Sequence, residues 1–202
     1  MTKMLIAAAM LSLGMAVALA LTFVVPKPLE YQSIEWLESP RQLQNFSLQS
    51  DTAAFNNQAL QGRWTIVVFG FMHCPDICPT SLNQLADLAA KLVRITADHN
   101  MAYVFVSVDP GRDALAKVGD YARFFNPTFV GLTGSEGQLK ALAGSLGVQF
   151  RVSPEKDNYQ VSHSVTFSII GPEGNLVGRF YPGFNTANLS EELLFRLRMA
   201  AV

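Results

Sequence analysis

Residues 65–79 are TIVVFGFMHCPDICP, and this stretch decides most of what can be predicted about the fold. Its first half, Thr65–Phe71, is a short apolar run rich in β-branched and aromatic residues, which predicts a buried central strand. Its second half contains both cysteines of the chain, Cys74 and Cys78. We expect the chemistry of the protein at this point, where the strand ends.

The cysteine pair is better explained by chemistry than by stability. A disulfide stabilises a protein mainly by closing a long loop, and only three residues separate Cys74 from Cys78. Thiols at this spacing suit a redox couple or two soft ligands for a thiophilic metal ion. If Cys78 lies in the first turn of a helix, the helix dipole should lower the thiol pKa. The inert alternative is a local disulfide or two buried thiols.

The pattern around this stretch predicts an α/β sandwich with a mixed sheet. Further strands are expected at residues 46–48, 102–108, 128–132, 165–170 and 176–180, and helices after Pro79, over 112–125, from Ser135 to Leu146 and from about Asn188. Ser135 and Gln138 have the spacing of a capping box. The glycines of residues 171–175 predict a hairpin turn.

The chain has three histidines that could act with the cysteines. His73 adjoins Cys74, whereas His99 is most simply a solvated residue at a helix end. His163 precedes an expected strand, and if that strand enters the sheet antiparallel, His163 reaches the edge where the cysteines lie. Two thiolates and one imidazole suit Cu(I), whereas structural zinc usually takes four ligands. Taken alone, His163 would be an ordinary polar residue at a strand end.

The first part of the chain differs in composition from the rest. Residues 4–25 carry no charge, and a helix of this length would span about 33 Å, enough to cross a bilayer. We therefore expect an uncleaved membrane anchor over 1–25, an exposed tether over 26–44 and a globular domain over 45–202. The alternative is a signal peptide cleaved near Ala18–Ala20, where small residues alternate.

The charge of the chain limits its function classes and its orientation in a membrane. The 202 residues carry a net charge of −1 and no cluster of Lys or Arg, so we expect no nucleic-acid partner. Only Lys3 precedes the apolar segment, which favours a short cytoplasmic tail and an exported domain. An exported domain places the cysteines in an oxidising compartment, where an unprotected pair tends toward the disulfide.

Four motifs in this order resemble the Sco/SenC family, over the chain from about Phe46 to its C-terminus. They are FMHCPDICPT at 71–80, VSVDPGRD at 106–113, YQVSHS at 159–164 and IGPEG at 170–174. The family consists of membrane-tethered, thioredoxin-like copper proteins that assist assembly of the dinuclear copper site of cytochrome c oxidase. The resemblance implies that Cys74, Cys78 and His163 bind one copper ion per chain.

The resemblance also implies a place and partners. It implies a single-pass protein of the bacterial inner membrane whose domain faces the periplasm, with the copper-site subunit of the oxidase as partner, together with a copper donor and a thiol reductant. One position departs from the family, because Ser162 stands where an aspartate usually precedes the ligand histidine. We expect copper affinity or partner docking to differ for that reason.

The other matching residues have simpler explanations. Asp109–Asp113 matches the family as well, and its ordinary explanation is a capped turn from a strand to a helix. His73 also matches, and we treat it as a neighbour of the ligands and not as one of them.

Two functions remain open at this point. The first is a copper chaperone that passes its ion to the oxidase subunit by ligand exchange. The second is a thiol-disulfide oxidoreductase that keeps the subunit's cysteines reduced, with Cys74 as the attacking thiolate. The CxxxC spacing and the lack of a proline before Val165 count against a general oxidoreductase. A peroxide-reducing enzyme of related fold is a weaker third candidate, because it would need a cysteine in a different motif.

Overall fold

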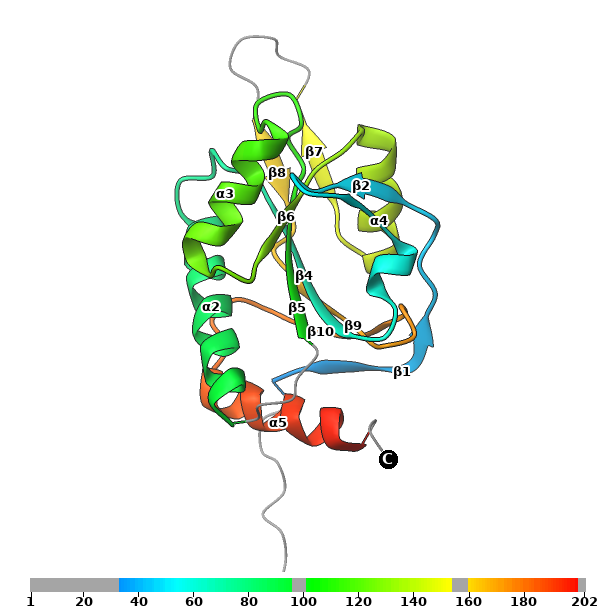
Figure 1. Cartoon of the computed structure of the whole chain (residues 1–202), viewed down its shortest axis with the longest axis vertical. Helices are drawn as coiled ribbons and strands as arrows, with labels where there is room; N and C mark the ends of the chain where they lie inside the picture. Colours follow the sequence, from blue (N-terminus) through cyan, green and yellow to red (C-terminus); the bar gives the residue numbers. More distant parts are fainter. Residues whose placement is uncertain (1–32, 96–100, 154–159, 200–202) are drawn as a thin grey trace, which may run out of the picture. The chain divides into compact units, whose positions relative to one another are not determined.

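The computed structural model describes residues 33–95, 101–153 and 160–199, which belong to one compact unit. Its centre is a six-stranded sheet of order β1-β10-β9-β4-β5-β6 (Figure 1). The strands are β1 (Glu35–Arg41), β4 (Trp64–Gly70), β5 (Met101–Ser107), β6 (Val130–Leu132), β9 (Phe167–Ile170) and β10 (Leu176–Phe180). Strands β4, β5 and β6 are parallel, whereas β9 is antiparallel to β4. The predicted mixed α/β sheet is confirmed.

The helices cover both faces of this sheet (Figure 1). One face carries α2 (Ile77–Ile95), α3 (Leu115–Phe125) and α5 (Thr186–Met199), and the other carries α4 (Glu136–Leu146). Alternate residues of β4 enter the two cores, because successive side chains of a strand point to opposite faces. Ile66 and Val68 join the first core, and Val67 and Phe69 join the second.

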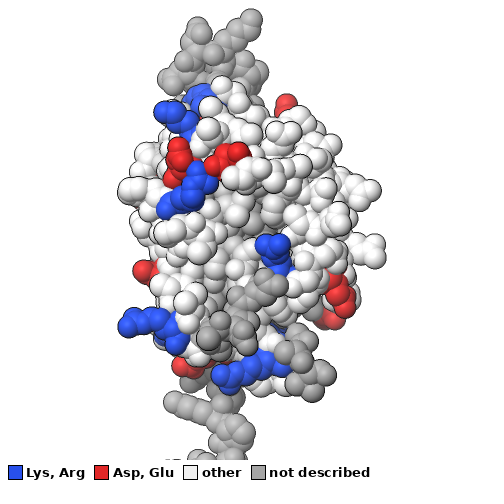
Figure 2. Space-filling model, viewed as in Figure 1, with Lys and Arg blue, Asp and Glu red and all other residues white. Residues whose placement is uncertain are grey.

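Several short elements complete the fold. They are the hairpin of β2 (Ser47–Gln49) and β3 (Ala54–Asn56), the 3-10 helix η1 (Asn57–Leu60), and the hairpin of β7 (Phe150–Val152) and β8 (Val161–His163). Only β2 has a counterpart among the predicted strands. On the face shown in Figure 2, acidic and basic side chains are interspersed over a larger uncharged area, so a field of one sign does not dominate that face.

The predicted tether is wrong for part of its length. Glu35–Arg41 forms β1, which pairs antiparallel with β10 at the edge of the sheet, and Ile34 is fully buried. An edge strand exposes one side to water and tolerates Pro40, so its composition resembles that of a linker. The expected anchor and the first part of the tether lie outside the described residues. Within the described ranges, no helix is long and apolar enough to cross a membrane.

The predicted helix starts also need correction. Ser135 does precede α4, but its side chain forms no cap, and the Gln138 side-chain oxygen accepts a hydrogen bond from the Ser47 N–H instead, at 2.6 Å. Helix α3 begins at Leu115, after a turn that follows β5. Helix α5 begins at Thr186, and the Asn185 side-chain oxygen accepts hydrogen bonds from the backbone N–H groups of Ala187 and Asn188.

Candidate metal centre

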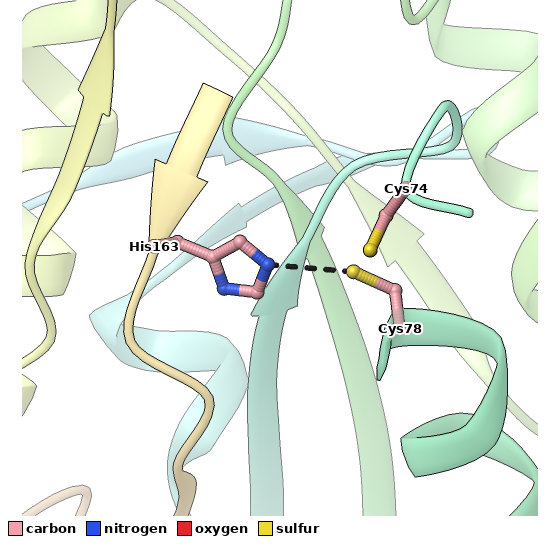
Figure 3. A group of neighbouring side chains, drawn as sticks. All are labelled: Cys74, Cys78 and His163. Carbon is pink, nitrogen blue, oxygen red and sulfur yellow. Dashed lines mark hydrogen bonds between the residues drawn. The ribbon is translucent and has the colours of Figure 1, made fainter. Parts of the chain in front are cut away.

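Cys74, Cys78 and His163 come together at the end of β4 (Figure 3). Their candidate ligand atoms, two sulfurs and one ring nitrogen, all lie within 4.8 Å of one another. The topology explains the meeting, because β9 runs antiparallel to β4 and the segment before β9 therefore arrives where β4 ends. The prediction that His163 would reach the cysteines is confirmed.

Cys78 is the more deeply placed of the two cysteines. It is the second residue of α2 and is 3% exposed, whereas Cys74 lies in the preceding loop and is half-buried. The sulfur of Cys78 packs close to Gly70, where an added Cβ would lie 3.1 Å from it and 2.7 Å from a ring carbon of Phe105. A glycine at the end of β4 therefore leaves room for the sulfur.

Burial raises the pKa of the Cys78 thiol to about 12, and a hydrogen bond with Cys74 adds to the rise. A nearby charge on Asp113 raises this pKa further. The predicted lowering of the thiol pKa at the helix N-terminus is thus wrong for Cys78, because the loss of hydration on burial is the largest effect on this thiol. A metal ion must displace the proton of this thiol when it binds.

His163 presents one nitrogen to Cys78 and the other to its own backbone. Its Nδ1 lies 3.2 Å from the carbonyl oxygen of Ser164, which can only accept, so Nδ1 carries the proton. Its Nε2 then accepts from the Cys78 thiol at 3.3 Å. Burial lowers the pKa of His163, which favours the neutral ring. A neutral imidazole whose Nε2 lone pair points toward the thiols can bind a metal ion once the metal has displaced the Cys78 proton.

The ring of His163 is also held by packing. Its centroid lies 5.8 Å from that of Phe71 in an edge-to-face arrangement, with an interplanar angle of 87°. Phe71 directly follows β4, so the central strand orients the histidine as well as the cysteine loop.

Asp113 anchors the loop that carries Cys74, and sequence reasoning missed this role. Its buried carboxylate accepts hydrogen bonds from the Met72 N–H at 2.8 Å and from the Ser107 hydroxyl at 2.6 Å. The other carboxylate oxygen lies 3.4 Å from Nδ1 of His73. The parallel pairing of β4 and β5 could have pointed to it, because the loops after both strands meet at one edge.

The remaining candidates lie outside the sulfur site. His73 is exposed and groups with Asp109 and Asp113, not with the cysteines. Asp109 pairs with Arg112 within the turn after β5, so the capped-turn explanation holds for these two residues. Ser162 is exposed beside His163 on β8. His99 lies outside the described residues.

Comparison with known proteins gives a consistent result. A family model described as SCO1/SenC matches residues 37–197. A mitochondrial SCO1 homolog of Arabidopsis thaliana is 36% identical over 155 residues, which cover 76% of this chain and 46% of the relative. The chain thus spans about half the length of that relative.

Solved structures show the same fold. The crystal structure of Arabidopsis thaliana ScoI with copper bound is 35% identical, has a TM-score of 0.70, and is matched over 77% of this chain and 98% of that one. Yeast Sco1 with copper bound is 28% identical, with a TM-score of 0.69 over 79% and 90% of the two chains. These likenesses confirm the thioredoxin-like α/β fold of the domain.

Proposed function

The chain belongs to the SCO1/SenC family, and from that premise we propose that it is a copper chaperone. It binds one copper ion through Cys74, Cys78 and His163 and delivers the ion to the copper-site subunit of a cytochrome c oxidase during assembly. The observation that carries the proposal is the meeting of two sulfurs and one imidazole nitrogen within 4.8 Å.

The donor set favours copper over its competitors. Thiolates are soft ligands that bind Cu(I) well, and a third ligand from imidazole completes a site that this ion accepts. Structural zinc usually requires a fourth protein ligand, and within the described ranges the group of His and Cys side chains here holds three. The copper-bound Arabidopsis and yeast Sco structures support the same choice for this chain.

Anaerobic titration of the reduced full-length protein with Cu(I), in detergent and against a competing chelator, tests this proposal. We expect about one copper per chain, with sub-nanomolar or tighter affinity. Cys74→Ala and Cys78→Ala should abolish stoichiometric binding. His73→Ala is the matched control, because His73 adjoins the site but lies outside its ligand group. Zinc bound in place of copper, or copper retained when both cysteines are replaced by alanine, would refute the proposal.

The second candidate function is reduction of the partner's disulfide. Both cysteines are free and close together, which favours a redox pair. The Cys74 thiolate would attack one sulfur of the partner disulfide, and Cys78 would then attack Cys74. The chain would end as a disulfide and the partner as a dithiol, with two electrons and two protons transferred. The greater exposure of Cys74 suits it to the first attack.

We also propose that residues 1–25 anchor the protein in a bacterial inner membrane with the domain in the periplasm. The uncharged stretch of residues 4–25 supports this arrangement. Carbonate extraction of membranes, combined with thiol labelling of intact cells, tests it. The anchored protein should stay with the membrane and be labelled from outside, whereas release of a shorter soluble form would show that the segment is cleaved.

A further inference from the structure

A pocket of about 520 Å³ lies directly beside His163, between α4 and the β7–β8 hairpin. Its wall contains His163 but neither cysteine. Its lining includes Lys140 and Gly144 of α4, Arg151 of β7, and Ser162 and His163 of β8. One imidazole therefore belongs to two environments, with its Nε2 toward Cys78 and its ring at the wall of the pocket.

We propose that this pocket is the docking site for the copper-accepting loop of the partner subunit, a loop that carries acidic residues beside its metal ligands. The proposal rests on the proposed chaperone function and adds the route of the transfer. Two features of the pocket support it: its position and its charge.

The position follows from the exposure of the ligands. Cys78 is almost fully buried, so an incoming ligand cannot approach the ion from behind that sulfur. Imidazole is neutral and binds Cu(I) less strongly than a thiolate, so His163 is the ligand that leaves first. An incoming thiolate reaches the ion where His163 gives way, and the pocket opens at that side.

The charge of the lining favours an acidic partner. Lys140 and Arg151 contribute two positive charges, and the described lining contains no acidic residue. Lys140 already pairs with Glu136 on its own helix at 2.6 Å, which leaves Arg151 as the main cation. Arg151 stands opposite Ser162 in the register of β7 and β8, and a serine there gives the guanidinium no carboxylate on the neighbouring strand.

A glycine of α4 in the pocket lining offers a position for a test of the docking site. An added Cβ at Gly144, a residue of α4 that lines the pocket, would meet no atom within 4 Å, so a larger side chain can start there without a clash and narrow the pocket. Gly137 lies on the same helix about two turns earlier, is equally open, and does not line the pocket. Both substitutions should also favour the helix, because glycine is a poor helix former.

The test measures copper transfer from the Cu(I)-loaded full-length protein to two acceptors. One is the purified copper-site domain of the oxidase subunit in its dithiol form, and the other is dithiothreitol. Gly144→Phe should slow transfer to the protein domain about tenfold and change transfer to dithiothreitol less than about twofold. Gly137→Phe should leave both rates unchanged, and all variants should hold copper equally well at equilibrium.

Two charge variants test the acidic character of the partner loop. Arg151→Glu should slow transfer to the protein domain and remove most of its dependence on salt. Ser162→Asp should have a smaller effect of the same sign, because a carboxylate opposite Arg151 would occupy the guanidinium.

Each other outcome has a definite meaning. Equal transfer rates for Gly144→Phe and Gly137→Phe would overturn the docking site while the chaperone function stands. If Gly144→Phe slowed copper transfer equally to both acceptors, the pocket would be a channel for any ligand and would not be a docking site for a protein. If the wild-type protein loads no copper, the chaperone function falls and the docking site falls with it.

Discussion

The carboxylate of Asp113 accepts a hydrogen bond from the backbone N–H of Met72 at 2.8 Å, and this bond joins the loops that follow two neighbouring parallel strands. The same carboxylate accepts from the Ser107 hydroxyl, so its position is set from β5. Met72 lies two residues before Cys74. The bond therefore ties the loop that carries Cys74, the less buried of the two cysteines, to the centre of the sheet.

Two replacements of Asp113 should show whether its hydrogen bonds or its negative charge matter for the site. Asp113→Ala leaves donors without an acceptor and should destabilise the domain by about 1–3 kcal/mol. It should also weaken the affinity for Cu(I) about tenfold, because the loop that carries Cys74 is no longer held in place. Asp113→Asn retains an acceptor oxygen and should recover most of both losses. Urea unfolding and competitive Cu(I) titration measure the two effects, and wild-type copper affinity in the alanine variant would contradict this role.

The Cys78 thiol should become reactive only at high pH. The pKa of Cys78 is raised from 9.0 to about 12, so near neutral pH it is a thiol and reacts slowly, since the thiolate is the nucleophile. Alkylation at Cys78 should rise about tenfold per pH unit through pH 10 without levelling. In urea-unfolded protein the rate should level near pH 9. Iodoacetamide labelling with peptide mass mapping measures each cysteine, and early labelling of Cys78 would contradict the assignment.

Gly70→Ala should displace the Cys78 sulfur, because Gly70 lies against it at the end of β4. The added methyl group would lie 3.1 Å from the Cys78 sulfur and 2.7 Å from a ring carbon of Phe105, so one of them must move. We expect Cu(I) affinity to fall at least about fivefold, since the buried sulfur loses its position. Gly137→Ala is the control, because its methyl group meets nothing and the helix should gain about 0.5–1 kcal/mol. Unchanged affinity in Gly70→Ala would show that the sulfur is free to shift.

The buried parts of the fold could be predicted from the sequence, and the edges could not. Apolar runs marked β4 and β5 because both faces of these strands are buried, and the leucines of α2 repeat at helical spacing. The composition of β1 predicts a tether, because an edge strand is mostly exposed. The β7–β8 hairpin has three-residue strands, which are too short to show a period.

The residues that make up the site could be predicted from the sequence, but the burial of each side chain could not. The spacing of Cys74 and Cys78 and the antiparallel approach of the segment bearing His163 were sufficient to bring the three residues together. The burial of Cys78 depends on packing against Gly70 and Phe105, which lie on different strands. The direction of its pKa shift therefore could not be obtained from its position in a helix alone.

His163→Ala tests the central claim most directly, because it removes one proposed ligand and leaves both sulfurs in place. Competitive titration of the reduced full-length variant should show Cu(I) binding weakened at least about tenfold, while reduction of a partner disulfide continues. In cells the variant should then fail to restore oxidase assembly. Unchanged copper affinity together with full restoration of assembly would contradict copper delivery and favour the reductase function.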